Sequence, residues 1–206
     1  MARWEGNTRG RLERAALDLF TEQGYDRTTV AQIAKRANLT ERSFYRWFPD
    51  KREVLFGGGE ELQERFVAAI EAAPAGADPL AMLMAAFATA PEVIRPREFL
   101  RERSAVIAAN PPLHERELIK VASLSEALVA ALARRGHDPR AARLATDAGM
   151  AIFRHAGQRW MADEHADHAR LLSDSAADLL AVLTPNAVPG GANAGPHLGL
   201  PGTEQG

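Results

Sequence analysis

The chain has 206 residues, of which 46% are hydrophobic and 25% are charged, as in ordinary globular proteins that combine a small domain with a larger one. It contains no cysteine, which excludes disulfides, zinc–thiolate sites and thiol catalysis and agrees with a cytoplasmic location. The first ten residues lack the apolar segment of a signal peptide, and no run approaches the ~18 apolar residues of a membrane span. We therefore expect no membrane partner.

Charge is unevenly distributed along the chain. The formal net charge is −2, but residues 1–56 carry +3 and the remainder carries −5. A basic N-terminal part joined to an acidic body predicts that only the former meets a polyanion such as nucleic acid.

The hydrophobic pattern is helical almost throughout. Apolar residues recur at three- and four-residue spacing, and glycines and prolines stand where helices would stop or restart. We expect an all-α fold of about nine helices, with a three-helix head (residues 1–55) on a larger helical-bundle body (56–184). Residues 185–206 are rich in glycine and proline with almost no charge, which predicts a disordered tail.

The first two predicted helices have clear boundaries. The first ends at Gly24 and presents one apolar face, formed by Leu12, Ala15, Ala16, Leu19 and Phe20. Thr29 and Gln32 form a T-x-x-Q capping box, which predicts a short helix through Ala37. Asn38 follows, and asparagine tolerates the left-handed backbone that a tight turn needs.

A third helix, expected at residues 40–47 with Thr40 as its cap, completes a helix-turn-helix. Leu39, Phe44 and Phe48 can anchor its apolar side. The outward positions are Glu41, Arg42, Ser43, Tyr45 and Arg46. Such a helix suits the major groove of DNA, where arginine reads guanine and hydroxyls meet bases or phosphates.

The segment that follows predicts a long helix leaving the head. Asp50 and Glu53 form a second capping box, which would open this helix. The three glycines at 57–59 are not a phosphate-binding loop, because no Lys-Ser/Thr pair follows, and we expect a weak point or kink within the helix.

The run FTEQGYDRTTVAQIAKRANLTERSFYRWFPDKREVL resembles the DNA-binding domain of TetR/AcrR-type regulators. The matching features are Gly24-Tyr25, Thr29-Val30, Ile33-Ala34, Tyr45, Phe48-Pro49 and Lys51. The resemblance covers about a quarter of the chain. It implies a repressor that binds a palindromic operator as a homodimer and is released by a small, largely apolar ligand.

The resemblance also assigns roles within the head. Thr29 and Lys51 would contact phosphates, and Thr40 would cap the recognition helix beside a phosphate. Arg42, Ser43 and Tyr45 would face the groove, and Arg46 would grip backbone or base. Glu41 stands where lysine is frequent and Arg42 where glycine is frequent, so the operator sequence cannot be inferred from relatives. Glu41 could accept a hydrogen bond from cytosine, or remain a solvated charge near the helix N-terminus.

For the body, the resemblance implies a ligand pocket in the central helices and a two-fold interface formed by the last two. The apolar candidates for the pocket need no ligand to explain them, because plain core has the same spacing; they are Phe66, Met82, Met84, Phe87, Phe99, Ile107, Phe153 and Trp160. Mostly small residues and one leucine-rich face predict the interface at Ala145, Ala148, Gly149, Ile152, Ala156, Leu172, Ala176, Leu179 and Leu183.

No motif for catalysis emerges. The chain has no nucleophile with an adjacent base, no HExxH and no GxSxG, so we expect neither enzymatic activity nor a cofactor. His165 and His168 have the spacing of a metal pair, but acidic residues at a helix start explain the same segment. An all-helical enzyme and a protein-interaction module with a degenerate helix-turn-helix remain alternatives to a sequence-specific transcriptional regulator.

Overall fold

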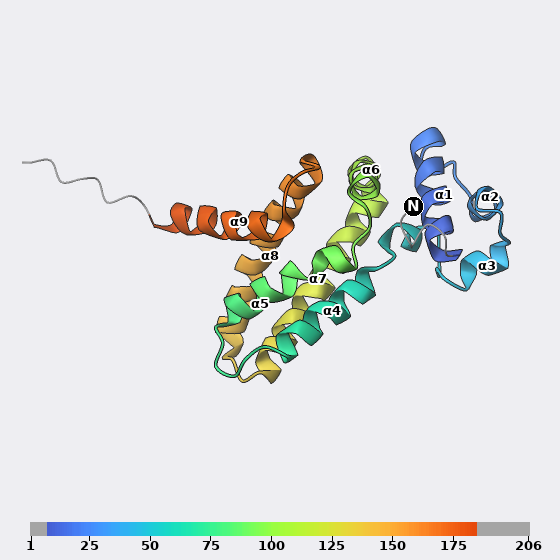
Figure 1. Ribbon diagram of the computed structural model, residues 1–206. Coiled ribbons are helices and arrows are strands. Elements are labelled where there is room, and N and C mark those ends of the chain that lie inside the picture. The colour runs from blue at the N-terminus through green and yellow to red at the C-terminus, as the bar shows by residue number, and fades with distance from the viewer. Residues whose placement is uncertain (1–7, 185–206) are drawn as a thin grey trace, which may run out of the picture.

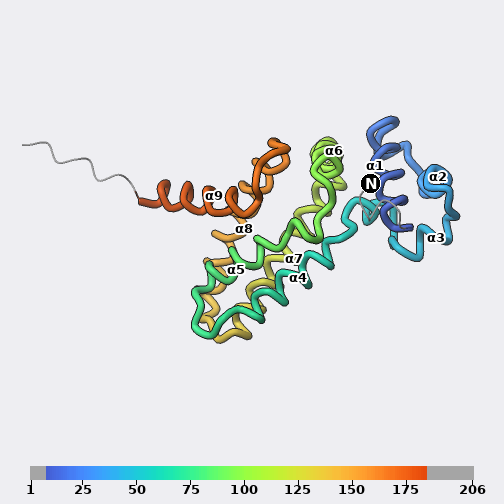
Figure 2. The backbone as a smooth tube through the Cα atoms, viewed as in Figure 1, coloured from blue at the N-terminus to red at the C-terminus, as the bar shows by residue number. Residues whose placement is uncertain are grey.

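The computed structural model describes residues 8–184, and this part of the chain is helical without strands, as expected (Figures 1 and 2). It contains nine α-helices and two short 3-10 helices. The elements are α1 (Thr8–Gln23), α2 (Val30–Arg36), α3 (Glu41–Tyr45), η1 (Glu53–Phe56), α4 (Gly59–Glu71), α5 (Pro79–Ala88), η2 (Ala90–Glu92), α6 (Arg97–Ala108), α7 (Pro111–Arg134), α8 (Pro139–Ala162) and α9 (His168–Leu183). The expected tail at 185–206 lies outside the described residues.

The head and the body occupy opposite ends of the molecule in Figure 1. Helices α1–α3 form the head, and α6 stands between the head and the α8–α9 pair. In the body, α4 packs against α5 and α7, while α8 packs against α5, α7 and α9. None of the described helices is both long and apolar enough to cross a bilayer.

Aspartates begin three of the body helices. Asp78, Asp138 and Asp167 are the N-caps of α5, α8 and α9, and each side chain accepts hydrogen bonds from backbone N–H groups of the first turn. Proline occupies the first turn of α5 and α8, where its missing N–H costs nothing.

An aromatic cluster forms the centre of the body. Phe66 of α4 lies 5.1 Å from Phe87 of α5 and 5.5 Å from Phe153 of α8, between ring centroids. Phe87 and Phe153 are stacked at 4.8 Å. These geometries are those at which aromatic pairs add to the stabilisation from buried area.

The prediction of a long helix that begins at Asp50 is wrong. Asp50 does cap, accepting from the backbone N–H of Arg52 (2.7 Å) and Glu53 (3.2 Å), but the turn that follows is the 3-10 helix η1. The chain then breaks at Gly57 and at Gly58, whose φ is +88°, before α4 begins. Position 57 needs glycine for a tertiary reason, because a Cβ there would lie 1.9 Å from Glu13 Oε1.

The core of the head continues into the body. Buried residues of α1–α3 and η1 share one cluster with Phe99, Val106 and Ile107 of α6 and with Leu113 of α7. The expected domain boundary at residue 55 therefore falls inside a continuous core.

Candidate functional site

The helix-turn-helix forms as the sequence predicts, beginning with the capping box of α2. Thr29 Oγ1 accepts from the Gln32 N–H at 3.2 Å, and Gln32 Oε1 accepts from the Thr29 N–H at 2.8 Å. Two backbone donors that the helix leaves unpaired are thereby satisfied.

Helix α1 fixes the turn between α2 and α3. Asn38 has a φ of +53°, the left-handed conformation expected for it. Arg11 of α1 donates to the carbonyls of Ala37 and Asn38. Arg36 of α2 pairs with Glu22 of α1 through two hydrogen bonds of 2.9 and 2.6 Å. The angle between the two short helices is thus set by side chains of the first.

Helix α3 is capped by Thr40, whose Oγ1 accepts from the Ser43 N–H at 3.1 Å. Phe44 is fully buried and Phe48 nearly so, with ring centroids 5.5 Å apart, which confirms them as anchors. The helix ends at Tyr45, two residues earlier than expected, with Arg46 as its C-cap.

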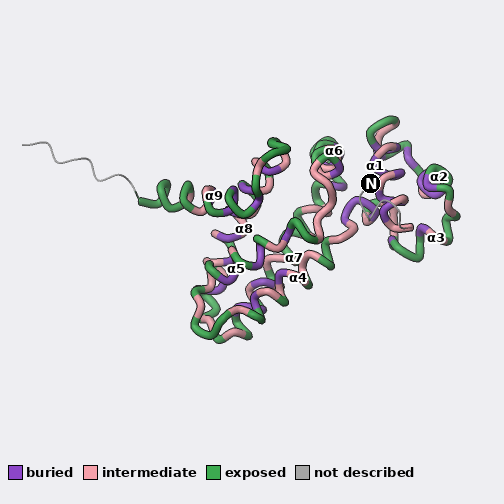
Figure 3. The backbone as a smooth tube through the Cα atoms, in the orientation of Figure 1, coloured by how far each residue is buried: buried purple, intermediate pink, exposed green. Residues whose placement is uncertain are grey.

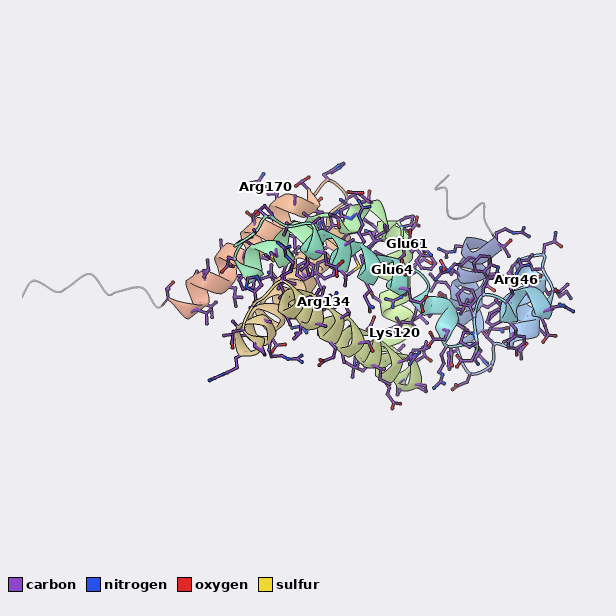
Figure 4. All side chains as sticks on the ribbon, turned by 90° about the horizontal axis from the view of Figure 1, so that it is seen from below. Arg46, Glu61, Glu64, Lys120, Arg134 and Arg170 are labelled. Atoms are coloured by element: carbon purple, nitrogen blue, oxygen red, sulfur yellow. The ribbon has the colours of Figure 1, made fainter. Side chains whose placement is uncertain are left out.

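Most of the side chains that the sequence predicts to contact DNA are exposed to solvent. The exposed ones are Thr29, Thr40, Glu41, Arg42, Tyr45 and Arg46. Figure 3 shows exposed stretches along α2 and α3. Figure 4 shows Arg46 on the head, far from the bulk of the body. Ser43 is half-buried, and its hydroxyl shares a 3.0 Å hydrogen bond with that of Thr40. Ser43 therefore belongs to the cap as well as to the surface.

Lys51 has an internal role that the sequence did not reveal. Its Nζ donates to the carbonyls of Tyr25 (2.7 Å) and Thr28 (2.9 Å) and lies 4.1 Å from the centroid of the Tyr25 ring. Burial lowers the pKa of this ammonium group. An ammonium group has three donors, so one N–H remains for the predicted phosphate contact. Lys51 also fastens the loop that leads into α2.

A cavity of about 480 Å³ lies between the head and the body. Its walls come from α1, η1, α4, α6 and α7 and from the segment before α6. Phe99 is the one predicted pocket residue among those that line it. Ile107 belongs to the core shared with the head, and the body core contains Phe66, Met82, Met84, Phe87, Phe153 and Trp160. In this structure those residues pack against one another.

A buried ion pair adjoins this cavity, and no sequence motif indicated it. Glu13 of α1 is 1% exposed, and Arg95 donates to both of its carboxylate oxygens at 2.8 and 2.9 Å. Arg9 lies 3.2 Å from the same carboxylate. An acidic residue on the buried face of an amphipathic helix was the available signal, because such a residue needs a partner.

Several residues of the predicted dimer interface are buried within the protomer itself. Gly149, Ile152, Ala156 and Leu172 are buried, and a Cβ at Gly149 would lie 3.2 Å from Phe87 and 3.3 Å from Leu83. These four residues are therefore covered within the protomer, at Gly149 by α5, which leaves little of their surface for the predicted contact with a second copy. Ala145, Ala148, Ala176 and Leu179 are half-buried, and Leu183 is 66% exposed.

Comparison with known proteins agrees with the head geometry. Residues 13–56 match the model of the bacterial regulatory proteins of the tetR family. The transcriptional regulator TcmR of Streptomyces glaucescens is 45% identical over 80 residues, which cover 39% of this chain and 35% of TcmR. The chain thus matches about a third of the length of this relative.

The fold of the whole described chain also has known counterparts. A transcriptional regulator from Aquifex aeolicus superposes with a TM-score of 0.55 at 20% identity, covering 85% of this chain and 99% of that one. NalD, the secondary repressor of the MexAB-OprM efflux pump of Pseudomonas aeruginosa, gives 0.50 at 22% identity, covering 84% and 94%. The N-terminal part of the chain is therefore similar to the helix-turn-helix domain of bacterial tetR-family regulators, and the described chain shares its fold with solved regulators.

Proposed function

We propose that the protein is a sequence-specific transcriptional repressor that binds a palindromic operator as a homodimer and is released by a small molecule. The observation that carries this proposal is α3, which is anchored by Phe44 and presents exposed Arg42, Tyr45 and Arg46. A helix with one buried side and one polar, partly basic side fits the major groove.

The exposed residues divide into two roles. Arg42 and Tyr45 lie within α3 and face the base edges, where an arginine can bond guanine bidentately. Thr29 and Thr40 are N-caps, where side chains and backbone N–H groups meet phosphates, and Arg46, the C-cap of α3, offers a basic side chain to the backbone. Glu41 reads cytosine or remains solvated, and the bound sequence will decide between these two.

The direct test is selection of bound duplexes from a random pool, followed by variants on the selected site. Arg46→Ala should weaken binding to all duplexes and make it less dependent on salt, because a phosphate contact is lost. Arg42→Ala should change base preference, at a cost of about 1–3 kcal/mol at one position. Arg170→Ala, on the exposed surface of α9, is the control (Figure 4). If no palindrome emerges and the head variants behave like the control, the proposal is wrong.

For the dimer, exposed apolar residues indicate a face other than the small-residue stripe. Leu144 of α8 is 71% exposed, and Leu180 and Leu183 of α9 are 60% and 66% exposed. Two copies that cover this face by a two-fold axis would place their recognition helices about 34–36 Å apart, as successive major grooves require. Leu144→Arg should shift the sedimentation of the protein toward a monomer, whereas Leu118→Arg, on exposed α7, should not.

A further inference from the structure

We propose that the cavity between the head and the body binds a small amphipathic anion, with its carboxylate near Arg103, Arg116 and Lys120 and its apolar part between α6 and α7. This inference rests on the proposed ligand-released repressor and specifies where the ligand lies and what chemistry it has. All three cationic residues line the cavity.

The size and walls of the cavity fit a small organic molecule. Its volume of about 480 Å³ falls within the ~300–1,000 Å³ of typical ligand pockets. Apolar side chains from three helices form much of the lining, namely Leu62, Phe99, Leu100, Ile119, Val121 and Leu124. Such walls favour an apolar ligand body over a fully polar metabolite.

The charges beside these walls favour an anionic head group. Arg116 and Lys120 of α7 share a single carboxylate, that of Glu53, which Arg116 hydrogen-bonds and which lies 3.0 Å from Lys120. Two cations thus face one anion at this point of the lining. Figure 4 shows Lys120 on the part of α7 that lies toward the head.

Arg103 is a third cation of the lining, and it is partly buried. Its Nε donates to the carbonyl of Leu55 at 2.6 Å and its Nη1 to Glu117 at 3.1 Å, while the guanidinium lies 5.0 Å from the centroid of Phe56. Burial lowers the pKa of Arg103 despite the partner Glu117. An added carboxylate would offset this cost of desolvation.

A cationic ligand fits the same cavity poorly. Of the carboxylates around it, Glu13 is bound by Arg95, Glu117 by Arg103, and Glu53 by two cations. The remaining one, Glu60, is exposed. A cation would therefore have to displace an arginine to find a buried partner, which leaves another charge unpaired.

The position of the cavity connects ligand binding with the DNA-binding head. Glu13, Leu55 and Phe56 belong to the head or to the segment that leaves it, whereas the opposite walls belong to the body. The Gly57–Gly58 break lines the same cavity. A molecule bound there contacts both parts at the point where the backbone changes direction, so it can favour one relative orientation over another.

The experiment compares three probes of one chain length on the full chain by calorimetry: decanoate, 1-decanol and decylammonium. We expect the dissociation constant of decanoate to be at least about tenfold lower than those of the other two, because like charges and unpaired charges are excluded from such a site. Equal binding of decanol, or tighter binding of decylammonium, would overturn the anionic assignment.

Location is tested with two matched variants of α7. Val121→Glu places a carboxylate on the cavity wall, and Leu118→Glu places one on the same helix away from the lining. The parent side chains are 44% and 57% exposed, so both variants should fold. Val121→Glu should raise the dissociation constant of decanoate about tenfold or more, and Leu118→Glu should leave it within about twofold. Equal effects would refute binding in this cavity.

A third variant tests the site independently in case Val121→Glu does not fold. Lys120→Gln removes the positive charge of a side chain that is 34% exposed. It should weaken the binding of decanoate but not that of decanol. Duplex binding without ligand is measured for all the proteins in parallel. If the wild type binds decanoate but no duplex, the proposed function fails and the site stands; if it binds duplex but not decanoate, the reverse holds.

Discussion

The head and the body are stabilised by different kinds of interaction. In the head, two helices of seven and five residues depend on side-chain caps and on charged groups of α1 that bind the turn. In the body, the two longest helices have 24 residues each, and their partners meet across an aromatic core. Short helices are unstable alone, so their geometry needs local polar contacts, whereas long amphipathic helices need only a partner surface.

This difference bears on function. Polar caps have strict requirements of residue type and spacing, which fix the orientation of α3 on the head. Apolar packing accepts many residues of similar volume, so side chains of the body can change while its fold is kept. Substitutions in each region can test whether head and body depend on these different interactions.

The largest effect is expected in the aromatic core. Phe87→Ala should lower the free energy of unfolding by about 3–5 kcal/mol, because Phe87 is fully buried between Phe66 and Phe153. Urea titration measures this loss, and Leu118→Ala, at an exposed position outside the proposed dimer face, should change stability by less than about 0.5 kcal/mol. A loss at Phe87 no greater than that at Leu118 would contradict the packing described.

The next effect concerns the ion pair that joins the two regions. Arg95→Ala should cost about 3 kcal/mol, because it leaves the buried carboxylate of Glu13 with Arg9 alone. Arg101→Ala removes an exposed pair with Glu164 and should cost under about 1 kcal/mol. The double variant Glu13→Leu/Arg95→Leu should recover much of the loss, since the buried carboxylate is gone and Arg9, which is 30% exposed, can be solvated. Failure of that recovery would mean that the ion pair is not the source of the cost.

Loss of an N-cap in the head should lower the free energy of unfolding by less than the two changes above, but it should also weaken duplex binding. Thr40→Ala should lower stability by about 1 kcal/mol and weaken duplex binding, because α3 loses its N-cap hydrogen bond to Ser43. Thr40→Ser keeps the hydroxyl and should retain most of both properties. Identical behaviour of the two variants would show that the cap does not position α3.

The smallest effect is a dependence on pH within the body. Burial lowers the pKa of His168, beside Phe153 and Trp160; Asp167 opposes this shift and Arg97 adds to it. The folded state therefore binds fewer protons than the unfolded state below the ordinary histidine pKa of ~6.5. The free energy of unfolding should fall as pH is lowered through this value toward the folded-state pKa.

Chemical denaturation at pH 7 and pH 5 measures this dependence. His168→Leu should flatten it, and His155→Gln, at an exposed side chain, should not. An unchanged slope in His168→Leu would assign the effect to other groups.

Much of the head could be predicted from the sequence. The capping box at Thr29, the left-handed Asn38 and the cap at Thr40 each depend on residues within four positions along the chain. The helical spacing of Phe44 and Phe48 predicted that both face the core. The class of fold followed from apolar periodicity for the same reason, because a helix contacts its own residues at three- and four-residue spacing.

The tertiary structure alone decided the rest. The residue next to Gly57 is Glu13, 44 positions earlier in the chain, and the residues next to Gly149 are Phe87 and Leu83 of α5. Lys51 donates to two carbonyls that are more than twenty positions away along the chain. The cavity lies where side chains of α1, α4, α6 and α7 meet without filling the space between them. The sequence shows that an apolar residue needs a surface to pack against and that a buried charge needs a polar partner. It does not show which residue will be that surface or partner, because any suitable group that the fold brings close can serve.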